Sequence, residues 1–302
     1  MGKIIRLARP QFLIASLAIF IIGASWALLL GAPFSLTRVL LGYSIILTAH
    51  LSVSFSNDYF DVEVDKLGKP SLFSGGSGIL VDYPRLRNGA LWIAIMLNLG
   101  SIALGILFIW MFSYPLWFMG YVVVSNLLGW FYSAPPLRLA YRGLGELLTA
   151  FTAGFLVPGM GYLVLRDYLN SEGMLFMIPL VLYSLAFILT VEIPDMEADR
   201  QGHKQTWVVR MGRRFAFNAT GVFILAATVF FFCIPGIYSH TLPLDFRLMG
   251  FLSLLPLGMG VLGIFKQPDD RQTATNLSNW IIVSLAVFFI LMDVVMIYTV
   301  IQ

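Results

Sequence analysis

NDYFDVEVD, residues 57–65, ends a long apolar run at 38–57. A second acidic stretch, EIPDMEAD at 192–199, ends another apolar run at 174–194. Each stretch holds four carboxylates, so the two together contain half of the 16 acidic residues in the chain. Carboxylates at the edge of a membrane are costly unless a cation compensates them. The two stretches therefore predict one cation site, built from two helices at the same membrane boundary.

The composition indicates a polytopic membrane protein. The chain has 302 residues, of which 59% are hydrophobic and 12% are charged, with a mean hydropathy of +0.85. Soluble domains carry about 25% charged residues. A net charge of +3 is too small to indicate nucleic acid binding, and the single Cys233 excludes a disulfide framework. The basic N-terminus lacks a small-residue cleavage site, so we expect the first apolar run to be retained.

The apolar runs predict an all-α fold with nine transmembrane helices in one domain, residues 1–302. A spanning helix needs about 20 mostly apolar residues. Pro158, with glycines at 154, 159 and 161, predicts that the fifth span is broken or closely packed. The nine predicted spans are 11–30, 38–57, 89–112, 115–133, 144–164, 174–194, 215–234, 248–265 and 278–300.

The positive charges support this count and give an orientation. With the N-terminus in the cytoplasm, 16 Lys and Arg residues fall inside and three fall outside, which is a strong positive-inside bias. The C-terminus is then outside, and both acidic stretches face the cytoplasm, as expected for a protein of the cell inner membrane. The three predicted outer charges are Arg38, Arg166 and Arg247.

Helical spacing turns each acidic stretch into an array of oxygen atoms. Residues four apart share one helix face, and this interval separates Asp61 from Asp65 and Asp195 from Asp199. Like charges in this arrangement repel unless cations intervene. Oxygen ligands without His or Cys favour Mg²⁺ over zinc, and Mg²⁺ usually binds carboxylates together with substrate phosphate. The predicted metal ligands are Asn57, Asp58, Asp61, Asp65, Asp195 and Asp199.

The loops after the acidic stretches have residues suited to a diphosphate. KLGKPSLFSGGSG at 66–78 offers backbone N–H groups and hydroxyls, although such runs are often only flexible loops. Lys204 follows the second stretch, and basic side chains there offset carboxylates or bind phosphate. Arg9 and Arg138 lie before the first span and after the fourth, so we expect both to reach the same cytoplasmic mouth.

Other interpretations assign the acidic residues no catalytic role. They could be solvated helix ends that pair with nearby Lys and Arg, as we expect for Glu63 and Glu197, which leave the inward face. Glu146 is similarly expected to pair with Arg142, four residues earlier. An ion-coupled transporter would carry acids near the midplane, whereas here they crowd one end.

The motifs resemble those of the UbiA-type intramembrane prenyltransferase family over nearly the whole chain. Residues 57–65 resemble its first metal motif, and DMEADRQGHKQT at 195–206 resembles its second. YSAPPLRLAYRGLGE at 132–146 resembles the intervening segment, and Arg9-Pro10 also fits. The resemblance implies nine helices around a central cavity that opens to membrane lipid. It also implies Mg²⁺-dependent prenyl transfer from an allylic diphosphate to an acceptor, commonly an aromatic ring.

The resemblance also implies roles for individual residues. The metal motifs would hold Mg²⁺ and diphosphate, with Asp61 and Asp195 among the catalytic residues. Tyr132 matches an inward tyrosine near the allylic carbon, and aromatic faces, including Trp130 and Phe60, can stabilise an allylic cation by roughly 0.5–2 kcal/mol each. The residues implied to contact the diphosphate are Asn57, Arg9, Lys69, Arg138 and Lys204, with Lys69 also catalytic.

The acceptor has more than one interpretation. YRGLGE at 141–146 is most similar to the menaquinone-type branch, whose acceptor is a dihydroxynaphthoate. DKLGKP at 65–70 is closer to archaeal members that form lipids from a glyceryl phosphate acceptor. Glu192 departs from the menaquinone-type pattern, in which a polar amide is common. A relative that binds or cyclises prenyl groups, without transferring them to an aromatic ring, also fits these motifs.

Overall fold

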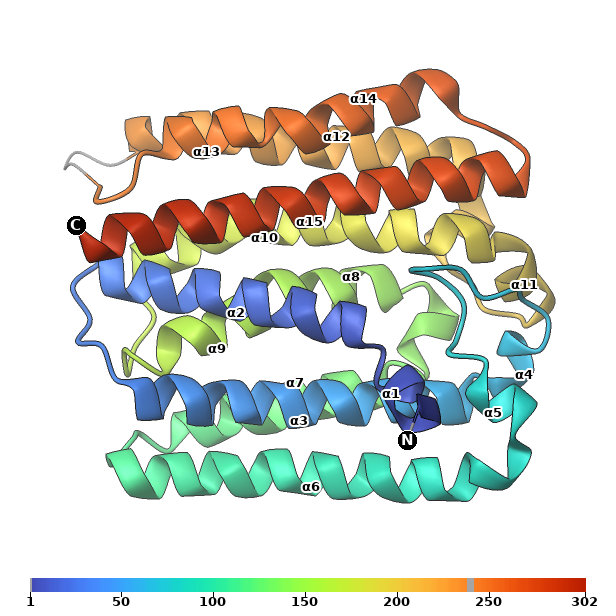
Figure 1. Cartoon of the computed structure of the whole chain (residues 1–302), viewed down its shortest axis with the longest axis horizontal. Coiled ribbons are helices and arrows are strands. Elements are labelled where there is room, and N and C mark those ends of the chain that lie inside the picture. The colour runs from blue at the N-terminus through green and yellow to red at the C-terminus, as the bar shows by residue number, and fades with distance from the viewer. Residues whose placement is uncertain (1, 238–241) are drawn as a thin grey trace.

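The computed structural model describes residues 2–237 and 242–302, and every regular element in that part of the chain is helical. The long helices lie side by side along the longest axis of the molecule (Figure 1). The main helices are α1 (Gly2–Ala8), α2 (Pro10–Leu29), α3 (Leu36–Phe60), α4 (Val62–Asp65), α5 (Ile79–Asp82), α6 (Arg87–Phe112), α7 (Trp117–Phe131), α8 (Gly145–Phe151), α9 (Val157–Leu163), α10 (Ser171–Glu192), α11 (Met196–Gln201), α12 (Trp207–Ile237), α13 (Phe246–Leu252), α14 (Leu254–Lys266) and α15 (Arg271–Ile301).

The helix lengths identify a multi-pass membrane protein. Within the described residues, six helical segments are long and apolar enough to cross a bilayer. The pair α13 and α14 is bent by 41° and brings the number to seven if it counts as one span. Helical structure lies at each of the nine ranges that the sequence predicts, but α7 and the α8–α9 region are short of a full span by length and composition. The all-α prediction is confirmed. Helix length by itself supports six or seven membrane spans among the described residues, rather than nine.

The fifth predicted span is interrupted, as its proline and glycines predict. A π-helical turn over Thr152–Leu156 separates α8 from α9, and Pro158 stands in the first turn of α9. A proline is tolerated there because the first N–H groups of a helix have no partner within it. The break lets this segment pass close to its neighbours α2 and α10, which both pack against it.

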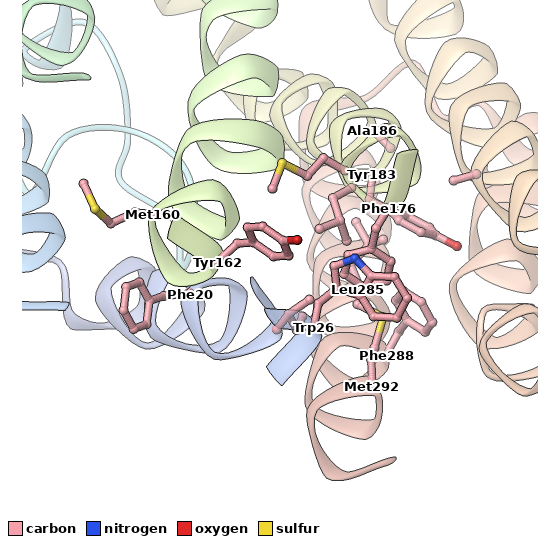
Figure 2. Packing of buried hydrophobic residues seen from close by; sticks show 14 of the residues in the cluster. Phe20, Trp26, Met160, Tyr162, Phe176, Tyr183, Ala186, Leu285, Phe288 and Met292 are labelled. Atoms are coloured by element: carbon pink, nitrogen blue, oxygen red, sulfur yellow. The ribbon is translucent and has the colours of Figure 1, made fainter. Parts of the chain in front are cut away.

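Aromatic side chains fill the core between α2, α10 and α15. Trp26 stacks on Phe176 at a centroid distance of 4.8 Å, and Tyr183 lies 5.0 Å from Phe288 (Figure 2). All four side chains are buried. Because lipid is as apolar as these residues, close packing rather than the hydrophobic effect holds such helices together.

The acidic stretches lie at the same end of the bundle. The first covers the end of α3 and all of α4, and the second covers the end of α10 and α11. Helix α4 packs against α11. Figure 1 shows both short helices at the end opposite the C-terminus, beside the loop that leads to α5. The tertiary fold therefore brings together two segments that are far apart in the sequence.

Gly23 permits the closest approach between α2 and α9. A Cβ atom at this position would lie 1.8 Å from the carbonyl oxygen of Pro158, so the backbone would have to move. We expect Gly23→Ala to destabilise the protein by about 1–3 kcal/mol, the usual cost of overpacking. Thermal unfolding in detergent would measure this loss. Gly100→Ala in α6 is the matched control, because its Cβ would meet nothing within 4 Å, and equal stability of the two variants would contradict the prediction.

Candidate active site

Lys204 joins the two acidic stretches. Its Nζ lies 3.5 Å from Oδ2 of Asp61 and 4.0 Å from Oδ1 of Asp199. Asp61 stands between α3 and α4, whereas Asp199 lies in α11. The three side chains are largely buried. Opposite charges in such a place interact more strongly than in water, so this contact fixes the spacing of the two stretches.

The charge of Lys204 is maintained by its neighbours. Burial by itself lowers the pKa of Lys204, but the carboxylates of Asp199 and Asp61 reverse this effect and hold the pKa well above its usual value. The ammonium group therefore carries its positive charge at neutral pH. A fixed cation beside carboxylates suits a leaving group that carries several negative charges.

Asp61 has two further partners, which were not predictable from the sequence alone. Ser133 donates a hydrogen bond to Oδ2 at 3.0 Å, and the hydroxyl of Tyr141 donates to Oδ1 at 2.9 Å. Both residues belong to the 132–146 segment, whose resemblance to the family was the available signal. With Lys204, these bonds hold Asp61 from two parts of the chain, the 132–146 segment and the loop after α11.

A loop over residues 71–78, here called the strap, binds the remaining carboxylates. The backbone N–H of Gly75 donates to Asp195 Oδ2 at 2.7 Å, and that of Gly76 donates to Asp65 Oδ1 at 3.1 Å. Ser77 donates to Asp58 through both its N–H and its hydroxyl. The strap thus crosses from the first acidic stretch to the second.

Arg9 provides a second cation. It forms an ion pair with Asp58, whose side chain is almost fully buried. Arg9 immediately precedes α2, and Asp58 lies in the last turns of α3, so the pair ties the start of the second helix to the acidic stretch.

Asp65 has an environment that opposes its negative charge. Burial raises the pKa of Asp65 to about 7, and the nearby Asp58 carboxylate adds to the rise while Arg9 opposes it. A proton and a cation therefore compete for this carboxyl group near neutral pH. In this structure the Asp65 carboxyl group accepts a hydrogen bond from the backbone N–H of Gly76 in the strap.

The donor atoms fit Mg²⁺ by type. All six predicted ligands offer oxygen, which Mg²⁺ prefers, and the amide oxygen of Asn57 is buried without a hydrogen-bond partner among the described residues. Within the same part of the chain, no three Asp, Glu, His or Cys side chains already converge on one point. Some carboxylates would have to exchange their present hydrogen bonds to bind a shared ion.

Two predicted diphosphate contacts lie outside this group. Lys69 is exposed, and its carbonyl oxygen accepts a bond of 2.8 Å from Arg271. Arg138 is also exposed, and its guanidinium stacks over the ring of Tyr141 at 4.9 Å. Arg138 is thus one residue removed from Asp61. Within the described residues, the Lys69 side chain makes no hydrogen bond or ion pair with the acidic stretches.

The predicted aromatic residues separate into two groups. Tyr132 lies within electrostatic range of Lys204, Asp61 and Glu192. The rings of Phe60 and Trp130 pack edge to face with their centroids 6.0 Å apart. Trp130 also packs against a small cluster of buried apolar residues that includes Phe55 and Ile79. Of these three predicted residues, Tyr132 is the one that the fold places near the charged groups, where Tyr141 also lies.

The two acidic residues that were predicted to point away from the site, Glu63 and Glu197, form ion pairs. Glu63 binds Lys66 at 2.8 Å, and Glu197 binds Arg213 at 2.6 Å, as the sequence predicts. For Glu146, however, the expected pair is wrong.

Glu146 is fully buried and accepts a hydrogen bond from the N–H of Trp207 at the start of α12. Arg142, the expected partner, instead donates to the carbonyl of Pro136. The first N–H groups of a helix need acceptors, so tertiary packing overrides the local spacing. Glu192 is also buried and lies close to both Glu146 and Asp199.

Several solved structures share this fold. A UbiA homolog from Archaeoglobus fulgidus bound to GPP and Mg²⁺ matches with a TM-score of 0.72 and 16% identity, covering 99% of this chain and 100% of that one. A structure of a digeranylgeranylglyceryl phosphate synthase matches with a TM-score of 0.64 and 16% identity, covering 98% of each chain. At such identities the likeness concerns the fold.

Sequence comparison assigns the family. The chain is 27% identical over 235 residues to the homogentisate phytyltransferase of Synechocystis sp., covering 75% of this chain and 72% of that protein. It is 27% identical over 220 residues to the 1,4-dihydroxy-2-naphthoate octaprenyltransferase of Bacillus subtilis, covering 72% and 68%. The model of the UbiA prenyltransferase family matches residues 16–290, which include both acidic stretches and Lys204. The chain therefore belongs to the UbiA prenyltransferase family.

Proposed function

We propose that the protein transfers a prenyl group from an allylic prenyl diphosphate to a lipophilic or aromatic acceptor in a Mg²⁺-dependent reaction. The observation that carries this function is the junction of two carboxylate arrays through Lys204 at one end of a membrane bundle. Carboxylates supply metal ligands, and the cations complement a diphosphate. A membrane bundle suits substrates with long hydrocarbon tails.

The arrangement in the membrane follows from the charge distribution. We propose nine crossings around a central cavity in one domain, with the N-terminus in the cytoplasm and the C-terminus outside. In this arrangement α7, the α8–α9 region and the α13–α14 pair each complete a crossing. The positive-inside bias supports this arrangement. The arrangement directs the site towards the cytoplasmic side of the cell inner membrane.

Six side chains are proposed to hold Mg²⁺. When bound, the ion would neutralise charge on the departing diphosphate oxygens. The buried amide oxygen of Asn57, free of other partners in the described chain, supports a ligand position at that residue. The proposed ligands are Asn57, Asp58, Asp61, Asp65, Asp195 and Asp199.

The remaining predicted site residues are proposed to bind the diphosphate and to stabilise the allylic cation. Lys204 and Arg9, both held by carboxylates, are proposed to contact the diphosphate oxygens and stabilise the charge that develops as the C–O bond breaks. Lys69 and Arg138 are exposed at the same end and are proposed to guide the diphosphate inwards. Tyr132 is proposed to face the allylic cation and stabilise it by roughly 0.5–2 kcal/mol.

An aromatic acceptor is favoured over a glyceryl phosphate. The two curated relatives described above are named for homogentisate and 1,4-dihydroxy-2-naphthoate, both aromatic. The lipid-forming synthase shares the fold at low identity, which does not extend to its acceptor. We therefore propose a ring carbon as the nucleophile, as in quinone biosynthesis, with a proton leaving that carbon after the new C–C bond forms.

Removal of divalent metal is expected to abolish prenyl transfer. The purified enzyme in detergent would be treated with EDTA, desalted and assayed with geranylgeranyl diphosphate and either homogentisate or 1,4-dihydroxy-2-naphthoate. The carboxylates cannot by themselves neutralise a diphosphate, so product should fall below detection and return when Mg²⁺ is added. Product formation would be followed by chromatography and mass spectrometry. Full activity in metal-free enzyme would contradict the proposal, and product from neither acceptor would contradict the acceptor class.

A further inference from the structure

The strap, residues 71–78, binds both acidic stretches through consecutive backbone donors. The N–H groups of Gly75, Gly76 and Ser77 donate to Asp195, Asp65 and Asp58 respectively. The first of these bonds joins residues 120 positions apart in the chain. Backbone donors in a row form a concave binding surface for anions. Here the anions are carboxylates that we propose as metal ligands.

Gly76 lets the backbone of the strap approach the Asp65 carboxyl group in its present position. A Cβ atom at this position would lie 1.7 Å from Oδ2 of Asp65 and 2.3 Å from its carboxyl carbon. Gly75 has a φ of +72°, a left-handed conformation that glycine adopts at little cost. The sequence of the strap is therefore fitted to the approach of its backbone to the carboxylates.

The strap also faces a cavity. A cavity of about 240 Å³ lies between the strap and residues at the end of α1 and the start of α2, including Arg6 and Gln11. Arg6 donates to the carbonyl of Ser77 at 3.2 Å, and Gln11 donates to the carbonyl of Leu72 at 3.3 Å. Both bonds are exposed to solvent, where a hydrogen bond contributes little net stability. The strap thus has room to move away from the acidic stretches.

We propose that the strap and Mg²⁺ compete for the same carboxylate oxygens, so that metal binding releases the strap and frees its N–H groups. This inference rests on the proposed function, which assigns Mg²⁺ to Asp58, Asp65 and Asp195. Once released from carboxylates, the N–H groups of Gly75, Gly76 and Ser77 are donors for the phosphate oxygens of the substrate. Metal binding would thereby make the strap N–H groups available to the diphosphate.

Hydrogen–deuterium exchange tests the competition without measuring catalysis. The full-length protein in detergent would be exchanged with and without Mg²⁺ alone, and peptides covering 72–80 compared with peptides from α12. Bonds to charged acceptors are the stronger kind, so their loss should speed exchange at 75–77 by about tenfold, with α12 unchanged. Unchanged or slower exchange at 75–77 across a full Mg²⁺ titration would overturn the proposal.

A glycine variant provides the second test. In Gly76→Ala the added Cβ would push the Asp65 carboxyl group away from the strap. The strap of this variant should therefore exchange rapidly before Mg²⁺ is added and respond no further. Gly68→Ala is the matched control on the same connection, because its Cβ would make an ordinary contact of 3.4 Å with Ala198. The control should keep the wild-type response. A slow, Mg²⁺-sensitive strap in Gly76→Ala would also overturn the proposal.

The two proposals fail separately. If Mg²⁺ speeds exchange of the strap but no acceptor yields product, the competition stands and the transferase assignment fails. If transfer proceeds with Mg²⁺ while exchange at 75–77 does not change, the transferase assignment stands and the competition fails.

Discussion

Asp61→Ala is expected to lower the rate of prenyl transfer by about 10³-fold or more. Asp61 receives bonds from Ser133, Tyr141 and Lys204, so it is the carboxylate at which three elements of the site meet. Its removal eliminates a proposed metal ligand and leaves the buried Lys204 with the more distant Asp199 at 4.0 Å. An uncompensated buried charge is strongly destabilising locally. The variant should therefore stabilise the leaving diphosphate less well, and the geometry of the site should be disturbed.

The measurement is product formation by the purified variant at saturating Mg²⁺ and prenyl diphosphate. Glu63→Gln is the matched control, because Glu63 belongs to the same acidic stretch but is exposed and binds Lys66. The control should retain nearly wild-type activity, and thermal unfolding should show that both variants are folded. Asp61→Ala with an undiminished rate would exclude Asp61 from the reaction.

Lys204→Met should lower the rate by about 10²-fold, comparable to the loss of one well-placed electrostatic contact in other enzymes. Methionine keeps much of the side-chain volume but removes the cation between Asp61 and Asp199. Two carboxylates then face each other unneutralised, and the diphosphate loses a proposed partner. Because the contact should strengthen as charge develops on the leaving group, kcat should fall more than KM rises.

Steady-state kinetics with varied prenyl diphosphate would separate the two parameters. Lys66→Met is the control, since Lys66 is a cation of the same end of the molecule whose partner is the exposed Glu63. A rise in KM with kcat unchanged would assign Lys204 to substrate binding alone. An unchanged kcat/KM would remove Lys204 from the site altogether.

Much of the fold could be predicted from the sequence because lipid leaves few choices. A backbone inside a bilayer must satisfy its own hydrogen bonds, so long apolar runs become helices. The ranges 38–57 and 174–194 correspond to α3 and α10 for this reason. The break at Thr152–Leu156 was also predictable, since proline and glycines are local signals. The acidic stretches were visible because charge is rare in such a chain.

The partners of individual side chains were not predictable, because they depend on contacts between distant segments. Lys204 and Asp61 are 143 positions apart, and no local pattern connects them. Glu146 shows the opposite case, in which a favourable spacing to Arg142 is overridden because the start of α12 needs an acceptor. Lys69, which resembles a basic position of the family, remains exposed.

The sequence by itself thus determined the helices, the two carboxylate arrays and the family resemblance, since these follow from local composition and spacing. Only the tertiary structure decided that Lys204 bridges the arrays and that the strap donates its N–H groups to Asp65 and Asp195. Backbone donors carry no side-chain signature, and their direction depends on how a loop is held between helices. The strap therefore had to be seen in three dimensions, where the packing of α4 against α11 brings its two acceptors within reach.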